Sequence, residues 1–326
     1  MVSWNAETND FIGDRTMRKL IWMSLALVVA CGDKTEDSGG GSLLGDGDGD
    51  ADGGGGGGGV FEDFISVTDP PIGNLDCFTG TLGTESPAAG CEATRTMTAT
   101  IMDFQDDVPV DEATAEIYLA DGIFGAPDTT SVADSNGMFS VEMPTCAAFT
   151  SKVYTDPVLD ATRVTIEAHD VLPYSSIPTV THELNSVSSA TYGLIPTFLG
   201  TSPDEEKGII AGSAYDCDGN QIEGLQVVVE DDSGAIPEGA IAKYFIDDFP
   251  NRNQPYTSAD GLWIIMDVPV GKWVVKGYVA DGLGGHSMVA RTELNVFAKS
   301  INISSLYTGI QDGVKMPDTC LAGCSR

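Results

Sequence analysis

The chain has 326 residues and a formal net charge of −33, because 49 acidic residues stand against 16 basic ones. Such a charge excludes nucleic-acid binding as a default function, since affinity for a phosphate backbone depends on clustered Lys and Arg. A strongly negative surface instead favours solubility outside the cytoplasm and attraction of cations.

Residues 17–30 have the order of segments that is typical of a bacterial signal peptide. Arg18 and Lys19 precede an apolar run at residues 20–30, which is too short to span a bilayer. Cys31 follows this run at once, and the arrangement resembles the lipobox of bacterial lipoproteins, in which the cysteine is acylated and becomes the first residue. The resemblance implies a lipoprotein signal peptide at residues 17–30 and a lipid on Cys31. The alternative is a free cysteine after an ordinary secretory signal.

The residues on either side of the signal extend this prediction. Residues 1–16 carry acidic side chains that are unusual before a signal, so we interpret them as a gene-model extension and expect translation to begin at Met17. Gly32 and Asp33 do not resemble the inner-membrane retention signal of some bacteria, in which Asp directly follows the acylated cysteine. We therefore expect a lipid-anchored protein of the cell envelope, in the outer membrane, with the lipid as its attachment to the membrane.

Residues 31–59 combine the predicted anchor with a disordered tether rich in Gly and Asp, which ends in seven glycines at 53–59. Such a composition cannot offset its ordering entropy by burial. The tether reaches roughly 30 Å as a flexible coil. Residues 48–53 fit the opening of a calcium loop, but Gly59 stands where a bidentate Glu is required, so we interpret them as a solvated linker.

Six cysteines remain after Cys31, an even number that suits three disulfides in an exported protein. They are Cys77, Cys91, Cys146, Cys217, Cys320 and Cys324. A zinc site is the weaker alternative, because the sequence has no CxxC pair and its histidines stand apart from its cysteines. For the pairing, we predict Cys77 with Cys91, and Cys217 with one of the two C-terminal cysteines.

The rest of the chain is predicted to be an irregular linker at residues 60–91 and two β-rich domains at 92–200 and 201–326, the second ending in a Cys-containing tail. In the second domain, short β runs alternate with turn residues, and no helical stretch is convincing. The strands expected there are 209–215, 225–230, 242–246, 262–266, 273–280, 288–297 and 301–307. Short strands at this spacing indicate an all-β antiparallel sandwich.

Four sequence blocks of the second domain occur in a characteristic order, at residues 212–216, 222–227, 258–265 and 268–275. Together they resemble the carboxypeptidase regulatory-like domain, a transthyretin-like β-sandwich with an Asp-Gly-x-aromatic hairpin and a Pro-x-Gly-x-aromatic hairpin. The resemblance covers about residues 208–307, implies the fold and says almost nothing about function. Trp263 and Trp273 each follow a glycine by two residues, and we expect both to be buried in the core.

The first domain repeats this pattern more weakly, at residues 99–103, 113–119, 135–141 and 152–154. Pro144-Thr145-Cys146 stands where Pro-x-Gly would be expected, so we predict a different turn there, with Cys146 in a disulfide. The fold predicted for the chain is therefore all-β, with two tandem antiparallel Ig-like or transthyretin-like β-sandwiches after a disordered tether.

No catalytic, metal-binding or cofactor-binding arrangement stands out in the sequence. The histidines at 169, 182 and 286 form no HExxH motif, and each is expected to be a surface residue or one with satisfied hydrogen bonds. Acidic pairs at 106–107, 231–232 and 247–248 are interpreted as solvated turns, with calcium at the loop ends of a sandwich as the alternative.

The predicted function is that of a non-enzymatic, lipid-anchored envelope protein whose β-sandwiches serve as binding or spacer modules for an unknown protein or glycan partner. An accessory subunit of an envelope enzyme or transporter is the first alternative. A carbohydrate-binding surface protein is the second, with Tyr256, Tyr278 and Phe249 as the aromatic candidates.

Overall fold

The computed structural model describes residues 70–156, 162–283 and 285–322. The gene-model extension at 1–16, the signal peptide at 17–30, the lipid anchor at Cys31 with its tether at 31–59, and Cys324 lie outside the described residues. Within the described part, no helix is long and apolar enough to cross a membrane.

The first sandwich is built from seven strands. They are β1 (Thr94–Asp103), β2 (Thr114–Tyr118), β3 (Thr129–Val132), β4 (Met138–Pro144), β5 (Ala148–Tyr154), β6 (Thr162–Val171) and β7 (Thr179–Ser188). One sheet has the order β3-β2-β5-β6 and the other the order β4-β1-β7. Burial alternates along β1, because successive side chains of a strand point to opposite faces. Met97, Ile101, Ile117 and Phe149 therefore meet in one core between the sheets.

The second sandwich contains the remaining strands. They are β8 (Gly208–Tyr215), β9 (Leu225–Glu230), β10 (Ile241–Ile246), β11 (Phe249–Asn251), β12 (Leu262–Val268), β13 (Gly271–Ala280), β14 (His286–Val296), β15 (Ser300–Ile303) and β16 (Leu306–Tyr307). One sheet has the order β11-β10-β12-β8-β15, with β16 beside β8, and the other has the order β14-β13-β9. Trp263, Ile210, Val227 and Val275 pack between them. The predicted run at 301–307 is divided here into two short strands.

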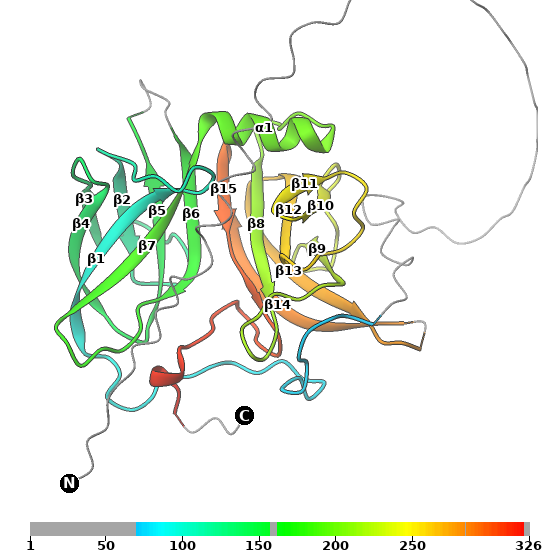
Figure 1. The fold of residues 1–326 in the computed structure, drawn as a ribbon, viewed down its shortest axis with the longest axis horizontal. Coiled ribbons are helices and arrows are strands. Elements are labelled where there is room, and N and C mark those ends of the chain that lie inside the picture. Colours follow the sequence, from blue (N-terminus) through cyan, green and yellow to red (C-terminus); the bar gives the residue numbers. More distant parts are fainter. Residues whose placement is uncertain (1–69, 157–161, 284, 323–326) are drawn as a thin grey trace, which may run out of the picture. The chain divides into compact units, whose positions relative to one another are not determined.

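These two sandwiches confirm the all-β fold, and their sheets are continuous with each other. β15 pairs in parallel with β8 of its own sandwich and with β6 of the first sandwich. One sheet thus runs in the order β3-β2-β5-β6-β15-β8-β12-β10-β11 (Figure 1). Parallel pairing also joins β1 to β7. Most strand pairs are therefore antiparallel, as predicted, and the few parallel pairs were not predicted from the sequence.

One helix, α1 (Ser189–Leu199), connects the two sandwiches, and the sequence analysis did not predict it. Ser188 caps its first turn by accepting a hydrogen bond from the Thr191 amide, and Gly200 ends it in the left-handed conformation with φ +81°. Its apolar face covers the outer side of the shared sheet, where Ile209, Ile264 and Ile301 from three neighbouring strands cluster. Packing against these side chains stabilises a helix that its own short sequence would not maintain.

Residues 70–91 form no named strand, yet they lie along the second sandwich before the chain enters the first. Ile72 bridges to Glu223, and Gly83 bridges to Ile310. Leu75 and Phe78 pack against the core of the second sandwich. We call residues 70–91 the N-terminal strap, because they attach to the domain that comes last in the sequence.

Candidate functional site

The described cysteines are arranged differently from the predicted pairs. Cys77 of the N-terminal strap is bonded to Cys217, with their Cα atoms 5.7 Å apart. The prediction of Cys77 with Cys91 is therefore wrong, and so is that of Cys217 with a C-terminal cysteine. The reason is that the strap docks beside the turn after β8, where the Cys217 amide donates a hydrogen bond to the Asn74 carbonyl. Nearness in sequence does not determine which cysteines this docking brings together.

Three further cysteines, Cys91, Cys146 and Cys320, are brought together in a buried cluster. Their sulfur atoms all lie within 4.8 Å of one another. The Cys146 sulfur lies beside each of the other two. Because a sulfur atom forms only one disulfide, the three cysteines can form at most one disulfide among themselves. A disulfide at Cys146 is therefore supported, and both Cys91 and Cys320 lie near enough to be its partner.

A second cluster lies where strands β6 and β7 separate. These neighbours in sequence are paired only at Thr162–Ser188 and Arg163–Val187. Beyond that point β6 continues along β5 in one sheet, and β7 continues along β1 in the other. Side chains rather than backbone groups therefore bridge the gap between the two strands.

The bridging side chains are two carboxylates, a histidine and an amide. His182 Nε2 lies 2.5 Å from Asp170 Oδ2, and the Asn185 side-chain amide donates to Glu167 Oε2 at 3.1 Å. All four residues are partly buried. We call Glu167, Asp170, His182 and Asn185 the acid–histidine bridge.

Two groups of the acid–histidine bridge have unusual proton affinities, for different reasons. Burial raises the pKa of Glu167 to about 7, and the nearby negative charge of Asp170 acts in the same direction. Burial alone would lower the pKa of His182, but the hydrogen bond to Asp170 and the carboxylate charges outweigh it and raise that pKa above 6.5. Both groups therefore hold protons near neutral pH more tightly than they would in water.

A bulge in β6 aims its side chains in different directions. The register against β5 shifts between Phe149 and Ser151, and His169 in the extra position has a φ of +63°. Its Nε2 lies 2.6 Å from the carbonyl oxygen of Glu293 on β14 of the second sandwich. His169 thus joins the two sandwiches, while His182 joins the two sheets of the first sandwich. The expectation of satisfied hydrogen bonds is met at Nε2 of both histidines, but His169 Nδ1 is buried without a hydrogen-bond partner among the described residues.

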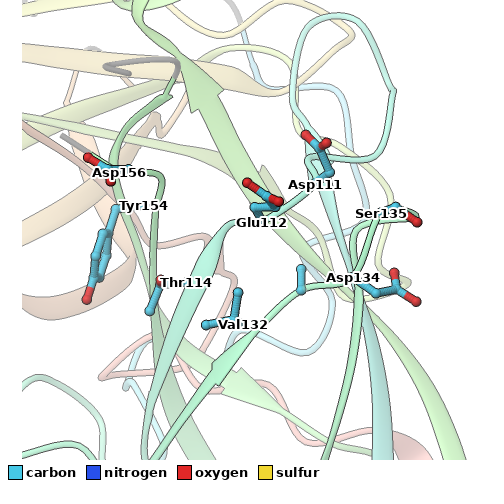
Figure 2. A pocket seen from close by; sticks show the side chains of 9 residues that line it. Asp111, Glu112, Thr114, Val132, Asp134, Ser135, Tyr154 and Asp156 are labelled. Atoms are coloured by element: carbon cyan, nitrogen blue, oxygen red, sulfur yellow. The ribbon is translucent and has the colours of Figure 1, made fainter. Parts of the chain in front are cut away.

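An acidic cavity of about 580 Å³ lies at one end of the first sandwich, where β2 begins and β3 and β5 end (Figure 2). Asp111, Glu112, Asp134 and Asp156 line it, and Figure 2 shows Asp134 and Asp156 on opposite sides of Thr114 and Val132. Asp134 accepts hydrogen bonds from the backbone amides of Met138 and Asn136, which lower its pKa. The cavity therefore carries a concentrated negative field, to which cationic groups are attracted.

The other residues that the sequence analysis named are placed as follows. The acidic pairs at 106–107, 231–232 and 247–248 all lie in turns. Trp263 is buried as predicted, with 1% of its surface exposed. Trp273 packs against the core but is only half-buried, and it donates its indole N–H to the Pro269 carbonyl at 2.7 Å, so the expectation of burial in the core is met for it only in part. Its side chain lies at the edge of the core, where the tight Pro269–Gly271 turn leaves it partly open.

The three aromatic candidates for glycan binding do not form an exposed strip. Tyr256, Tyr278 and Phe249 are all half-buried. Phe249 packs edge-on against Phe198 of α1, with ring centroids 6.4 Å apart. The carbohydrate alternative therefore gains no support from these side chains.

The acid–histidine bridge was not predicted from the sequence, in which His182 alone of its residues was considered as a candidate. The relevant partners lie twelve and eighteen residues apart, on two strands that separate into different sheets. The bulge at His169 lies between Glu167 and Asp170 and interrupts the alternation of β6, so local periodicity does not place the two carboxylates on one side of the strand.

Comparisons with known proteins concern the fold. No family model matches the chain, and no curated protein matches it. Among solved structures, the shaft pilin SpaA of Lactobacillus rhamnosus GG has 10% identity and a TM-score of 0.23, over 66% of this chain and 98% of the pilin. The Bacillus anthracis TIE protein has 13% identity and a TM-score of 0.22, over 66% of this chain.

This chain spans only 34% of the Bacillus anthracis protein. Hydroxyquinol 1,2-dioxygenase of Pseudomonas putida DLL-E4 has 12% identity and a TM-score of 0.21, over 33% of this chain and 63% of the enzyme. Similarity at this level indicates neither a shared fold nor a shared activity.

Proposed function

We propose that this protein is a non-enzymatic, lipid-anchored envelope protein whose joined sandwiches form a stiff spacer. The observation that carries the proposal is the continuous sheet through β6, β15 and β8. Domains joined by a flexible linker move relative to each other by default. Here backbone hydrogen bonds cross the junction, and His169 adds a contact to Glu293. Bending at this junction would break these bonds, so the pair is suited to holding a fixed spacing.

The N-terminal strap supports the same function. The chain that follows the proposed anchor enters the described structure at residue 70, and its N-terminal strap is bonded to the second sandwich through Cys77–Cys217. A pull from a membrane anchor is therefore transmitted first to the second sandwich, through a covalent bond and packed Leu75 and Phe78. The first sandwich, with its acidic cavity, follows the strap in the chain and is joined to the second sandwich by the shared sheet and the His169–Glu293 contact.

Two measurements test the proposal separately. Cys31→Ser is expected to move the protein from the detergent-soluble membrane fraction to the soluble fraction, and an unchanged distribution would contradict the anchor. For stiffness, fluorophores on non-natural amino acids at Asn136 and Glu238, which are exposed turn residues of the two sandwiches, should report one narrow distance distribution. A broad distribution would contradict a spacer.

An exposed apolar surface favours the accessory-subunit alternative as a second candidate. Leu194 and Phe198 of the uncharged helix α1 are about two-fifths exposed, and Ile246 beside Phe249 is similar. Single exposed apolar residues are common, but neighbouring ones on a helix and a strand edge mark contact surfaces. If a partner subunit binds here, Phe198→Ser should abolish its co-purification from membranes, whereas Leu283→Ser, at an exposed turn elsewhere, should not.

A further inference from the structure

Two of the clustered cysteines are held together by the first sandwich alone. Cys91 precedes β1, and Cys146 lies in the turn after β4. The β1–β4 ladder begins at Thr94–Pro144, and the Thr145 amide extends it by donating to the Ala93 carbonyl at 3.1 Å. The ladder therefore keeps Cys91 and Cys146 close wherever the C-terminal segment lies.

Cys320 reaches the cluster through a separate set of contacts. It belongs to a short 3-10 helix, Asp318–Cys320, in the segment that follows β16. The Ala88 amide donates to the Cys320 carbonyl, and Pro87 bridges to Leu321. The Tyr174 amide also contacts the Cys320 sulfur at 3.3 Å. These contacts place Cys320 beside Cys146 without requiring a bond between the two sulfurs.

We propose that Cys146 is an exchange centre, which moves one disulfide between Cys91 and Cys320. The Cys320 thiolate attacks the Cys146 sulfur of the Cys91–Cys146 disulfide; the Cys146–Cys320 bond forms, the Cys91–Cys146 bond breaks, and Cys91 leaves as a thiolate that takes up the proton lost by Cys320. The step consumes no oxidant or reductant, because one disulfide and one thiol are present before and after it.

The two pairings differ in what they attach. Cys91–Cys146 closes a loop within the first sandwich and its entry segment. Cys146–Cys320 instead bonds the first sandwich to residues 308–321, which we call the C-terminal strap. This strap lies along the second sandwich, where the Gly309 amide donates to Val289 of β14 at 2.7 Å. Exchange at Cys146 therefore makes or breaks a covalent bond between the two sandwiches, which we call the lock, in addition to the hydrogen bonds of the shared sheet.

The first experiment detects both pairings. The full chain is purified with Cys31→Ser and Cys324→Ser. Of the three cysteines in the cluster, one then remains a thiol when the other two form a disulfide, and the result does not depend on membrane anchoring. Exchange is stopped with acid, thiols are labelled, and linked peptides are identified by mass spectrometry. We expect both the Cys91–Cys146 and the Cys146–Cys320 linked peptides in one preparation. After incubation at a pH above the thiol pKa, the ratio of the two linked peptides should return to the same value.

Three results would overturn the proposal: a single fixed pairing, a Cys91–Cys320 bond, or three free thiols with one bound zinc ion per chain. Failure of the anchor would instead appear in the Cys31→Ser fractionation, so the two proposals are distinguished.

The second experiment measures the lock with a matched pair of variants in the same background. Cys91→Ser leaves only the Cys146–Cys320 pairing, and Cys320→Ser leaves only Cys91–Cys146, so each variant lacks one buried sulfur. Hydrogen exchange of residues 308–321 should be about tenfold or more faster in Cys320→Ser, because the strap then opens without a covalent constraint. Exchange of the β13–β14 ladder serves as the folding control. Equal rates of hydrogen exchange in the C-terminal strap of two folded variants would show that the position of the disulfide does not affect how the strap is held.

Discussion

His182 Nε2 lies 2.5 Å from Asp170 Oδ2 and connects two strands whose backbones are paired only at their other end. The contact keeps β6 and β7 together at the place where they leave for opposite sheets. Its neighbour Glu167 is also bridged to β7, through Asn185. The state of protonation at this bridge is therefore linked to the stability of the first sandwich.

This linkage predicts that stability falls as pH rises through about 7. The pKa values of Glu167 and His182 are both raised in the folded protein, from ordinary values of 4.5 and 6.5. The folded state therefore binds more protons than the unfolded state in this range. The stabilisation is fully present at low pH and is lost as pH passes the folded pKa values. We expect urea unfolding to show a loss of the order of 2 kcal/mol between pH 5.5 and 8.5.

Glu167→Gln is the variant that isolates the carboxyl group. Its neutral amide resembles protonated Glu167, so the variant should be close to wild type at pH 5.5 and more stable than wild type at pH 8.5. The flattened profile would be measured by the same urea series. Ser135→Ala, in the exposed turn between β3 and β4, removes no titratable group and is the control that should leave the slope unchanged. A slope unaffected by Glu167→Gln would contradict a role for the acid–histidine bridge.

The two tryptophans of the second sandwich should differ in their importance. Trp263 is 1% exposed in the centre of the core, whereas Trp273 is half-buried at its edge. Trp263→Ala is expected to cost about 3–5 kcal/mol, and Trp273→Ala about half of that, because less apolar surface is lost and the cavity opens to solvent. Chemical unfolding of both variants, followed by circular dichroism, gives the comparison. Equal losses would contradict the difference in packing.

Gly212 on β8 is a position at which a methyl group has no room. A Cβ there would lie 2.3 Å from the Ser304 carbonyl oxygen and 2.7 Å from Trp263 Cζ2. Gly212→Ala should therefore destabilise the protein by about 1–3 kcal/mol through overpacking. The matched control is Gly193→Ala in α1, where no atom lies within 4 Å of the new Cβ, and a gain of about 0.5–1 kcal/mol is expected. Similar thermal midpoints for the two variants would contradict this account.

The Cys77–Cys217 disulfide should stabilise the attachment of the N-terminal strap. It joins residues separated by 140 positions, so it constrains a long loop of the unfolded chain. Cys77→Ser is expected to cost about 2–5 kcal/mol in urea unfolding. Alkylation of the unreduced variant should label Cys217, whereas the wild-type pair stays unlabelled. A linked Cys77–Cys91 peptide in the wild-type protein would contradict the connectivity.

Much of the fold follows from local sequence patterns. Short β runs between turn residues predicted the strands around Trp263 and Tyr278, and Asp260-Gly261 marked a turn that the structure forms with a φ of +63° at Gly261. These features depend on residues only a few positions apart, so one sequence contains the information. Helix α1 had local signals too, since Ser188 and Gly200 are typical capping residues, but its few apolar positions did not separate it from a strand.

The pairings between remote segments were decided by tertiary structure. Parallel pairing of β15 with β6, the bond from Cys77 to Cys217 and the meeting of Cys146 with Cys320 all join segments more than a hundred residues apart. The short-range sequence determined that each segment is a strand or a turn and which face is apolar. Which segments become neighbours depends on how the two cores close and on where the straps dock, because burial of apolar surface is non-directional and only the assembled sheets supply partners for each edge.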